Sequence, residues 1–485
     1  MTPRYEAVIG LEVHAQLRTR SKIFCGCSAE FGAPPNERTC PVCLGHPGAL
    51  PVLNAAAVEL AVRGALALGS DVQRASVFAR KNYFYPDLPK GYQISQYEQP
   101  LAIDGIVEAK SDHWGPDTDI RIKRVHMEED AGKLLHEGFS DSDRRSYVDL
   151  NRAGVPLIEI VTEPDFRSSK DAANFFGYLR ELLMTLGVND GNMEEGSLRC
   201  DANVSIREKG SEALGTKAEV KNLNSFRFLE KALDYEFKRQ EDVVLGGGRV
   251  AQETRLWDAA AGRTSSMRSK EEAHDYRYFP EPDLPPLMVD PARVLSIGAS
   301  IPELPAARRS RLKSIHGLSD GDVVPLSVAR LDVYFEEMVR GGADAKAAKN
   351  WLLGVVRAKM NEEGFDSADT LRERVPPARL ADLLALVDKG TISGSVAKDV
   401  FEKMFVSGRT ADEIVKAEGL TQIDDESQIL GRIAEVLERN ADAVAQYRGG
   451  KTTTFGFLVG QVMKATAGKA NPKRVNELLK QALEG

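Results

Sequence analysis

Three segments of the sequence carry side chains suited to metal or phosphate chemistry at alternate positions. Within residues 8–17, 197–207 and 217–221, apolar or small residues alternate with charged or polar ones. A period of two is typical of β-strands with one buried side and one wet side. The candidate groups on the polar sides are Glu12, His14, Asp201, Asn203, Glu219 and Lys221. Carboxylates and an imidazole suit a divalent cation, and a lysine suits a phosphate. A solvated strand face of mixed charge is the alternative.

A second set of acidic residues lies where charge has to be compensated. Glu159 stands alone in the apolar segment 155–164, which predicts a strand. An unpaired carboxylate is costly to bury, so Glu159 must be paired, bound to a metal or directed into a cleft. Glu128, Glu129 and Asp130 follow a short basic strand predicted at 121–125. Three consecutive acids repel one another unless they are solvated or neutralised by a cation.

Four of the five cysteines form two close pairs, Cys25 with Cys27 and Cys40 with Cys43. Two thiol pairs separated by a loop can surround one tetrahedral Zn²⁺, and four thiolates leave no open position for catalysis. The segment 25–43 is therefore predicted to hold a structural zinc. Disulfides are the alternative, which a reducing cytosol disfavours.

The elements that must position these residues are strands and amphipathic helices. Segments 197–207 and 217–224 are joined by a short polar loop, which predicts an antiparallel hairpin. Apolar residues at helical spacing predict helices at 55–69 and 171–187. Segment 80–97 is rich in tyrosine and proline, which predicts an irregular loop, either a packed corner or an aromatic platform for a nucleotide.

Strand patterns disappear from about residue 296, and helical patterns dominate the rest of the chain. We therefore predict the α+β class. Residues 1–295 form a domain of mainly antiparallel sheet with flanking helices, residues 296–407 an all-α domain, and residues 408–485 an all-α tail.

The composition of the 485 residues is that of a water-soluble globular protein, with 42% hydrophobic and 28% charged residues. The first residues do not resemble a signal peptide, and no apolar run approaches the ~20 residues of a membrane helix. We expect a cytoplasmic protein without a membrane partner.

The net charge of −8 hides a basic region near the C-terminus. Residues 448–480 contain seven basic side chains and one acidic one, Glu477. Such a region favours a polyanion, and the candidate nucleic-acid contacts are Lys451, Lys473 and Arg474. A solvated helical face is the alternative.

Six motifs together resemble one family, the B subunits of aspartyl/glutamyl-tRNA amidotransferases. They lie at residues 8–14, 81–86, 126–133, 193–203, 217–224 and 275–282. The resemblance extends over nearly the whole chain. It implies a cradle-shaped sheet domain, a helical domain and a helical tail that contacts tRNA. It also implies a heterotrimer with an A subunit, which is a glutamine-hydrolysing amidase, and a small C subunit.

The resemblance implies a ligase reaction in protein biosynthesis, with ATP and Mg²⁺. The side-chain carboxylate of Glu-tRNA(Gln), Asp-tRNA(Asn) or both is phosphorylated, and ammonia channelled from the A subunit then displaces the phosphate. The implied metal centre, which also carries the catalysis, comprises Glu12, His14, Glu129, Glu159, Asp201 and Glu219. Asn203 and Lys221 are assigned to contacts with the nucleotide.

Two rival functions remain open at this point. A non-catalytic tRNA scaffold would use only the basic tail, and its binding would depend steeply on salt. A metal-dependent hydrolase would use Glu12 and His14 on a small substrate, without tRNA or a glutaminase partner.

Overall fold

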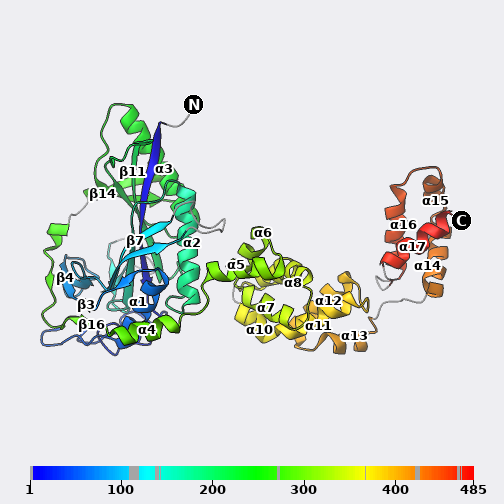
Figure 1. Ribbon diagram of the computed structural model, residues 1–485, viewed down its shortest axis with the longest axis horizontal. Helices are drawn as coiled ribbons and strands as arrows, with labels where there is room; N and C mark the ends of the chain where they lie inside the picture. The colour runs from blue at the N-terminus through cyan, green and yellow to red at the C-terminus, as the bar shows by residue number, and fades with distance from the viewer. Residues whose placement is uncertain are drawn as a thin grey trace. The chain divides into compact units, whose positions relative to one another are not determined.

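The computed structural model describes residues 4–108, 119–136, 141, 144–269, 273–365, 368–420, 426–466, 470 and 472–484 (Figure 1). Contacts between Cα atoms divide the chain into two compact units, Met1–Ser310 and Arg311–Gly485. This division rests on contacts alone, so the limits proposed at residues 295 and 407 stay predictions.

One nine-stranded sheet organises the first unit. Its order is β14-β13-β12-β11-β1-β10-β7-β6-β2, and among these neighbours only β12 and β13 run parallel within the described residues. In that order the strands are Arg263–Ser269, Glu253–Asp258, Ala218–Lys221, Leu198–Glu208, Tyr5–Gln16, Pro156–Thr162, Ile120–Glu129, Ala102–Val107 and Asp71–Val72. The predicted antiparallel hairpin is confirmed, because β11 pairs with β12 in that sense.

Helices cover the apolar side of this sheet. They are α1 (Ala55–Ala67), α2 (Ser169–Thr185) and α3 (Phe226–Leu245), and Figure 1 shows α2 and α3 running alongside the strands. In β1, Leu11 and Val13 are completely buried in the core beneath the helices, while Glu12 and His14 stay partly exposed. The alternation along the strand therefore leaves one side of the sheet polar and open.

A small sheet lies over one end of β7. It consists of β15 (Phe279–Pro280), β4 (Phe78–Asn82) and β5 (Tyr92–Gln96), and β5 packs against β7. The prediction of an irregular loop at 80–97 is therefore wrong at both ends of the segment, because these ends are strands that pair with each other. Two further pairs are β3 (Ala75–Ser76) with β16 (Leu287–Met288) and β8 (Lys133–Leu135) with β9 (Tyr147–Asp149).

Strand β7 is longer than the sequence pattern indicated. The basic strand predicted at 121–125 continues to Glu129, because residues 125–129 pair with β10. The acidic residues Glu128 and Glu129 therefore belong to a strand and face opposite sides of it.

The first unit ends with a 3-10 turn (Ala273–Tyr276), α4 (Pro291–Ala299) and the start of α5 (Pro305–His316). Ile297 in α4 packs into the main core.

The second unit is helical and has two separate cores among its described residues. The first core is formed by buried residues between Leu312 and Val415, and the second by buried residues between Ile429 and Leu483. Helices of the first are α6 Asp320–Val328, α7 Asp332–Arg340, α8 Ala345–Trp351, α9 Arg357–Glu363, α10 Ala368–Arg374, α11 Pro377–Asp388, α12 Gly394–Ser407 and α13 Ala411–Glu418, with a π-helical turn at Leu352–Val356. Those of the second are α14 Glu426–Arg439, α15 Ala441–Arg448, α16 Thr454–Ala465 and α17 Pro472–Glu484.

The predicted α+β class is confirmed by this combination of a mainly antiparallel sheet domain and helical cores. Within the described residues, every helix is too short or too polar to cross a bilayer.

Candidate active site

A row of four side chains crosses the polar side of the sheet in direct register. His126 of β7 lies opposite Glu159 of β10, Glu159 opposite His14 of β1, and His14 opposite Arg199 of β11. Residues directly opposite on neighbouring strands have Cβ atoms about 4.5–5.5 Å apart. Antiparallel pairing thus brings together residues that are far apart in sequence.

His14 and Glu159 of this row form a candidate metal centre together with Glu128, which lies two residues after His126 in β7. One ligand atom from each lies within 4.8 Å of the others. The His14 Nε2 atom is 3.4 Å from Glu159 Oε2 and 3.8 Å from Glu128 Oε1. Both carboxylates are almost completely buried, and oxygen ligands with one imidazole suit Mg²⁺ or a similar cation.

A second histidine faces the same two carboxylates. His126 Nε2 is 3.3 Å from Glu159 Oε2 and 3.7 Å from Glu128 Oε2. Burial alone would lower the pKa of His126, but the charge of Glu159 and the hydrogen bond to Glu128 raise it to about 8. Burial would raise the pKa of Glu159, but His126 and His14 hold it well below its ordinary value. The pair of carboxylates therefore demands positive charge, from imidazolium or from a metal.

A second group of polar residues lies next to this row. Glu12 of β1 lies opposite Asp201 of β11, and Asn203 of β11 lies opposite Glu219 of β12. The Asn203 amide donates to Glu12 Oε1 at 2.7 Å. Lys221 Nζ is 2.5 Å from Asp201 Oδ2 and 3.2 Å from Glu219 Oε1. One ammonium thus holds two carboxylates together.

These contacts determine the charge on Lys221. Burial alone would lower its pKa, but Asp201 and Glu219 outweigh burial and raise it. Lys221 is therefore a fixed positive charge at the wall of the cleft, suited to a phosphate oxygen.

An aromatic and basic wall closes the other side of the cleft. The rings of Tyr97 and Tyr278 stack with centroids 4.3 Å apart, and Lys81 Nζ lies 4.9 Å from the ring centroid of Tyr276. The open hollow between this wall and the sheet has a volume of about 630 Å³. A second hollow of about 440 Å³ shares Glu12 and Arg124 with it. The polar side of the sheet therefore offers two adjoining spaces of ligand size.

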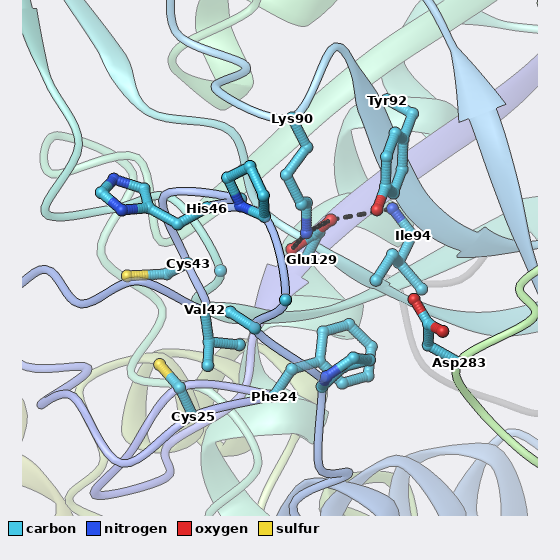
Figure 2. A pocket seen from close by; sticks show the side chains of 16 residues that line it. Phe24, Cys25, Val42, Cys43, His46, Lys90, Tyr92, Ile94, Glu129 and Asp283 are labelled. Carbon is cyan, nitrogen blue, oxygen red and sulfur yellow. Dashed lines mark hydrogen bonds and ion pairs between the residues drawn. The ribbon is translucent and has the colours of Figure 1, made fainter.

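Of the six residues predicted for the metal centre, five line the first hollow: Glu12, His14, Glu159, Asp201 and Glu219. Glu129 does not lie there. It points to the other side of β7, where Lys90 Nζ donates to its Oε2 at 2.6 Å and the Ile94 N–H to its Oε1 at 2.9 Å. Figure 2 shows Lys90 and Glu129 directed toward each other in a separate hollow of about 210 Å³. Glu128 lies in the place that the sequence assigned to Glu129.

The sequence contained a signal for the residues that were missed. His126 and Glu128 are two residues apart in a strand, the same spacing as Glu12 and His14, so both project from one side. Because the predicted strand ended at residue 125, the spacing of His126 and Glu128 was not recognised as that of two residues on one side of a strand. Arg199 and Asp130 also line the cleft, and their ion pair has an N–O distance of 2.9 Å.

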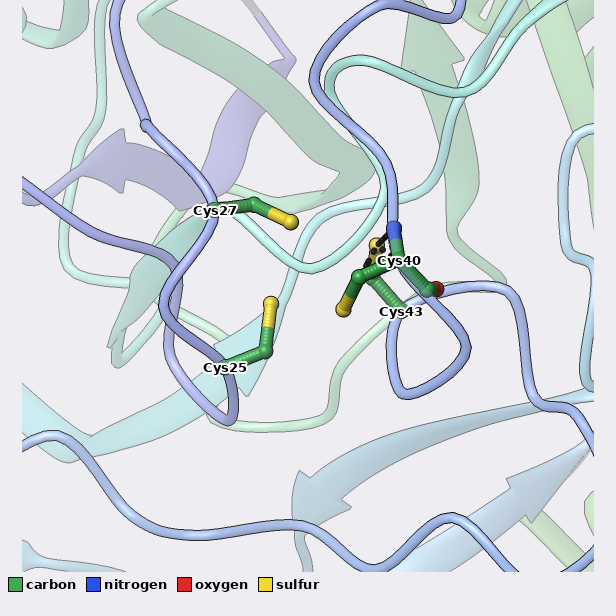
Figure 3. A group of neighbouring side chains, drawn as sticks. All are labelled: Cys25, Cys27, Cys40 and Cys43. Atoms are coloured by element: carbon green, nitrogen blue, oxygen red, sulfur yellow. Dashed lines mark hydrogen bonds between the residues drawn. The ribbon is translucent and has the colours of Figure 1, made fainter.

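The four cysteines form a compact cluster apart from the acidic cleft. Their sulfur atoms all lie within 4.8 Å of one another, and Figure 3 shows them converging on one point. The Cys40 and Cys43 sulfurs are 3.9 Å apart. Tetrahedral zinc with bonds of about 2.3 Å places sulfurs about 3.8 Å apart, whereas a disulfide needs about 2.05 Å. All four are free thiols, so the arrangement fits a metal site.

The Cys43 sulfur is the best-stabilised thiolate of the cluster. A hydrogen bond from Cys25, the Cys40 N–H and the ammonium of Lys22 together lower the pKa of Cys43, although burial opposes them. The thiolate form is the one that binds zinc.

We expect Cys43→Ser to abolish stoichiometric zinc binding and to lower the Tm by about 5–10 °C. This corresponds to the loss of about 2–3 kcal/mol, the stabilisation given by a ligand at about 100 times its Kd, at about 2–4 °C per kcal/mol. Metal analysis and differential scanning calorimetry check it. Cys200→Ser is the matched control, since Cys200 is a buried cysteine outside the cluster and its loss should leave the zinc content unchanged.

Two of the predicted nucleic-acid contacts can be placed in the tail. Lys451 is exposed and donates to Gln446 Oε1 at 3.2 Å. Arg474 pairs with Glu426 at 2.6 Å and with Glu477 at 3.0 Å. The side chain of Lys473 lies outside the described residues.

Comparison with known proteins gives consistent matches along the chain. The family model described as the GatB/GatE catalytic domain matches residues 7–294, and the one described as the GatB domain matches residues 333–483. The B subunit of the aspartyl/glutamyl-tRNA(Asn/Gln) amidotransferase of Geobacter sulfurreducens is 54% identical over 482 residues, 99% of this chain and 100% of that protein. The protein of the same name from Syntrophotalea carbinolica is 53% identical over 486 residues, 100% of both chains.

Proposed function

The chain belongs to the family of B subunits of aspartyl/glutamyl-tRNA(Asn/Gln) amidotransferases, and we propose that it is the ATP-dependent activating subunit of such a ligase. The family inferred from the sequence motifs is thereby confirmed. The proposed reaction converts Glu-tRNA(Gln), Asp-tRNA(Asn) or both into the corresponding amide. This subunit transfers the γ-phosphoryl group of ATP to the side-chain carboxylate, and ammonia then displaces phosphate from the acyl carbon.

The observation that carries this proposal is the convergence of His14, Glu128 and Glu159 across three strands. Phosphoryl transfer depends on positioning and on positive charge at the phosphate oxygens rather than on a protein nucleophile. Mg²⁺ held by these residues would neutralise charge on the transferring phosphoryl group. Glu12, Asp201 and Glu219 are the further carboxylates of the proposed centre, and Asn203 and Lys221 its phosphate contacts.

The two adjoining hollows match a reaction that joins two substrates. The nucleotide and the aminoacylated end of a tRNA must both reach the metal centre, and Glu12 lies in the wall of both hollows. The tyrosines of the first hollow offer flat surfaces on which a base can stack, worth about 1–3 kcal/mol per base. The side chains of the cleft bind and orient the reactants, and the buried carboxylates keep the cation in place.

The proposed partners follow from the family. They are the amidase A subunit, which supplies ammonia through a channel, the C subunit of the heterotrimer, and tRNA(Gln) or tRNA(Asn). Lys451, Lys473 and Arg474 are the proposed tRNA contacts of the tail. We propose that the four-cysteine zinc is structural and that the complex works in the cytoplasm.

The test is reconstitution of this chain with the A and C subunits, glutamine, ATP, Mg²⁺ and misacylated tRNA. We expect amidated tRNA and ATP cleavage that depends on the misacylated tRNA. A scaffold subunit would bind tRNA with steep salt dependence, yet leave ATP cleavage to another chain. In that case, variants of the cleft would not reduce ATP cleavage, and the proposal would be overturned.

We expect Lys221→Met to raise the KM for ATP about tenfold, because a charge-assisted contact to phosphate is worth about 1.5–3 kcal/mol. Lys238→Met is the matched control. Lys238 is an exposed lysine on α3 that also contacts two carboxylates, those of Glu241 and Asp242. Steady-state ATP cleavage checks both variants, and an unchanged KM in Lys221→Met would contradict the phosphate contact.

A further inference from the structure

Lys22 is a lysine without any solvent exposure, next to the four-cysteine cluster. A buried ammonium is costly unless its donors are used and its charge is balanced. Lys22 Nζ donates to Arg38 O at 2.8 Å, to Leu150 O at 3.4 Å and to Cys43 Sγ at 3.6 Å. The two carbonyl oxygens are neutral. The sulfur is the one acceptor of the three that can carry negative charge.

Lys22 also touches both arms of the cluster. Its backbone N–H donates to Cys27 O at 2.9 Å, on the first cysteine pair, while its side chain reaches Cys43 on the second. The neighbouring Ile23 N–H donates to Gly154 O at 2.9 Å, which ties this segment to the sheet domain. One residue thus connects the two cysteine pairs to each other.

The negative charge of a zinc-bound cluster would be partly neutralised by this contact. Zn²⁺ bound by four thiolates carries a net charge of −2, and Cys43, the buried cysteine of the four, has little access to water that could solvate its share of that charge. One adjacent ammonium reduces the net charge to −1. A hydrogen bond to the sulfur stabilises the thiolate that binds the metal.

We propose that Lys22 is part of the metal site: its ammonium compensates the charge of the four-thiolate cluster through Cys43 and braces the two cysteine pairs. This inference rests on the proposed structural zinc. It makes Lys22 a positioning residue, since it acts on the metal through a cysteine.

The test compares zinc affinity in the full chain by competition with a chromogenic chelator. Two variants remove the charge, one without and one with replacement donors for the two carbonyl groups. Lys22→Met keeps the length and removes the charge and the donors, and Lys22→Gln keeps donors for the carbonyls without the charge. We expect both to weaken zinc binding about 10–100-fold, the usual cost of removing a partner of a metal ligand.

Lys90→Met is the matched control. Lys90 is a mostly buried lysine in the hollow beside Cys25 and Cys43, but its ammonium contacts Glu129 instead of a sulfur. Figure 2 shows that separation. Its zinc affinity should stay close to that of the unsubstituted chain.

Thermal unfolding gives a second readout. Added zinc should raise the Tm of the Lys22 variants by less than it raises the Tm of the unsubstituted chain, because tighter binding stabilises more. A purely structural role would lower the Tm with and without zinc equally and leave the increment unchanged. Unweakened zinc binding in both variants would overturn the inference. A full chain that binds no zinc at all would instead overturn the proposed zinc site, and the inference with it.

Discussion

Replacing Glu159 by Gln is expected to lower the rate of tRNA-dependent ATP cleavage about 10²–10³-fold, the typical cost of losing one preorganised charged group at a reacting centre. The substitution keeps the shape of the side chain but removes the charge that lies 3.4 Å from His14 and 3.3 Å from His126. It also removes one of the three ligands of the candidate metal centre. Single-turnover measurement of ATP cleavage in the reconstituted complex checks the prediction.

Tight tRNA binding should persist in Glu159→Gln, because the proposed tRNA contacts of the tail lie on other residues. Raising the Mg²⁺ concentration should recover part of the rate, since a weakened site still fills at higher metal concentration. A rate equal to that of the unsubstituted complex at low Mg²⁺ would show that Glu159 has no part in the metal centre.

Much of this centre could be predicted from the sequence, because the alternation of polar and apolar residues shows which side of a strand each side chain faces. The alternation of apolar and polar residues in 8–17 and 197–207 assigned Glu12, His14 and Asp201 to the solvent-exposed side of two strands. A lone carboxylate at Glu159 in an apolar strand indicated a compensating partner. These arguments use only neighbours along the chain, and the structure brings the residues they selected into one cleft.

The partners of each residue could not be predicted in this way. That His14 faces Glu159 on one side and Arg199 on the other depends on the register of three strands, which comes from packing of the whole sheet. The small sheet was missed for a related reason. Segment 80–97 is dominated by tyrosine and proline, and its ends become strands only by pairing with each other and packing on β7.

The wrong assignment of Glu129 to the metal centre came from the predicted end of one strand. With the strand ended at residue 125, Glu128 and Glu129 are equivalent members of an acidic turn. With β7 extended to Glu129, they point to opposite sides of the sheet, and only Glu128 faces His14 and Glu159. The error lay in the length of the strand. The repulsion between the neighbouring acids is relieved by Ser95 and His126 on one side of the strand and by Lys90 on the other.

We expect Glu128→Gln to lower the rate of ATP cleavage about 10²–10³-fold, and Glu129→Gln to leave that rate nearly unchanged. The two variants make the same chemical change at adjacent, equally buried positions of one strand. Glu128 supplies an oxygen to the candidate metal centre, and its Oε2 accepts a hydrogen bond from Ser95 at 3.1 Å. Glu129 instead pairs with Lys90 in the hollow beside the cysteines.

The measured step has to be ATP cleavage, because amidation also depends on the arrival of ammonia and would mix two effects. Tm values separate loss of activity from loss of folding, and they should fall more in Glu129→Gln, which leaves the buried ammonium of Lys90 without its charged partner. The expected pattern is therefore crossed: Glu128→Gln is folded and inactive in phosphorylation, and Glu129→Gln is less stable and active. The reverse pattern would return Glu129 to the metal centre and would mean that β7 is displaced by one residue in the assembled enzyme, since a shift of one exchanges the two sides of a strand.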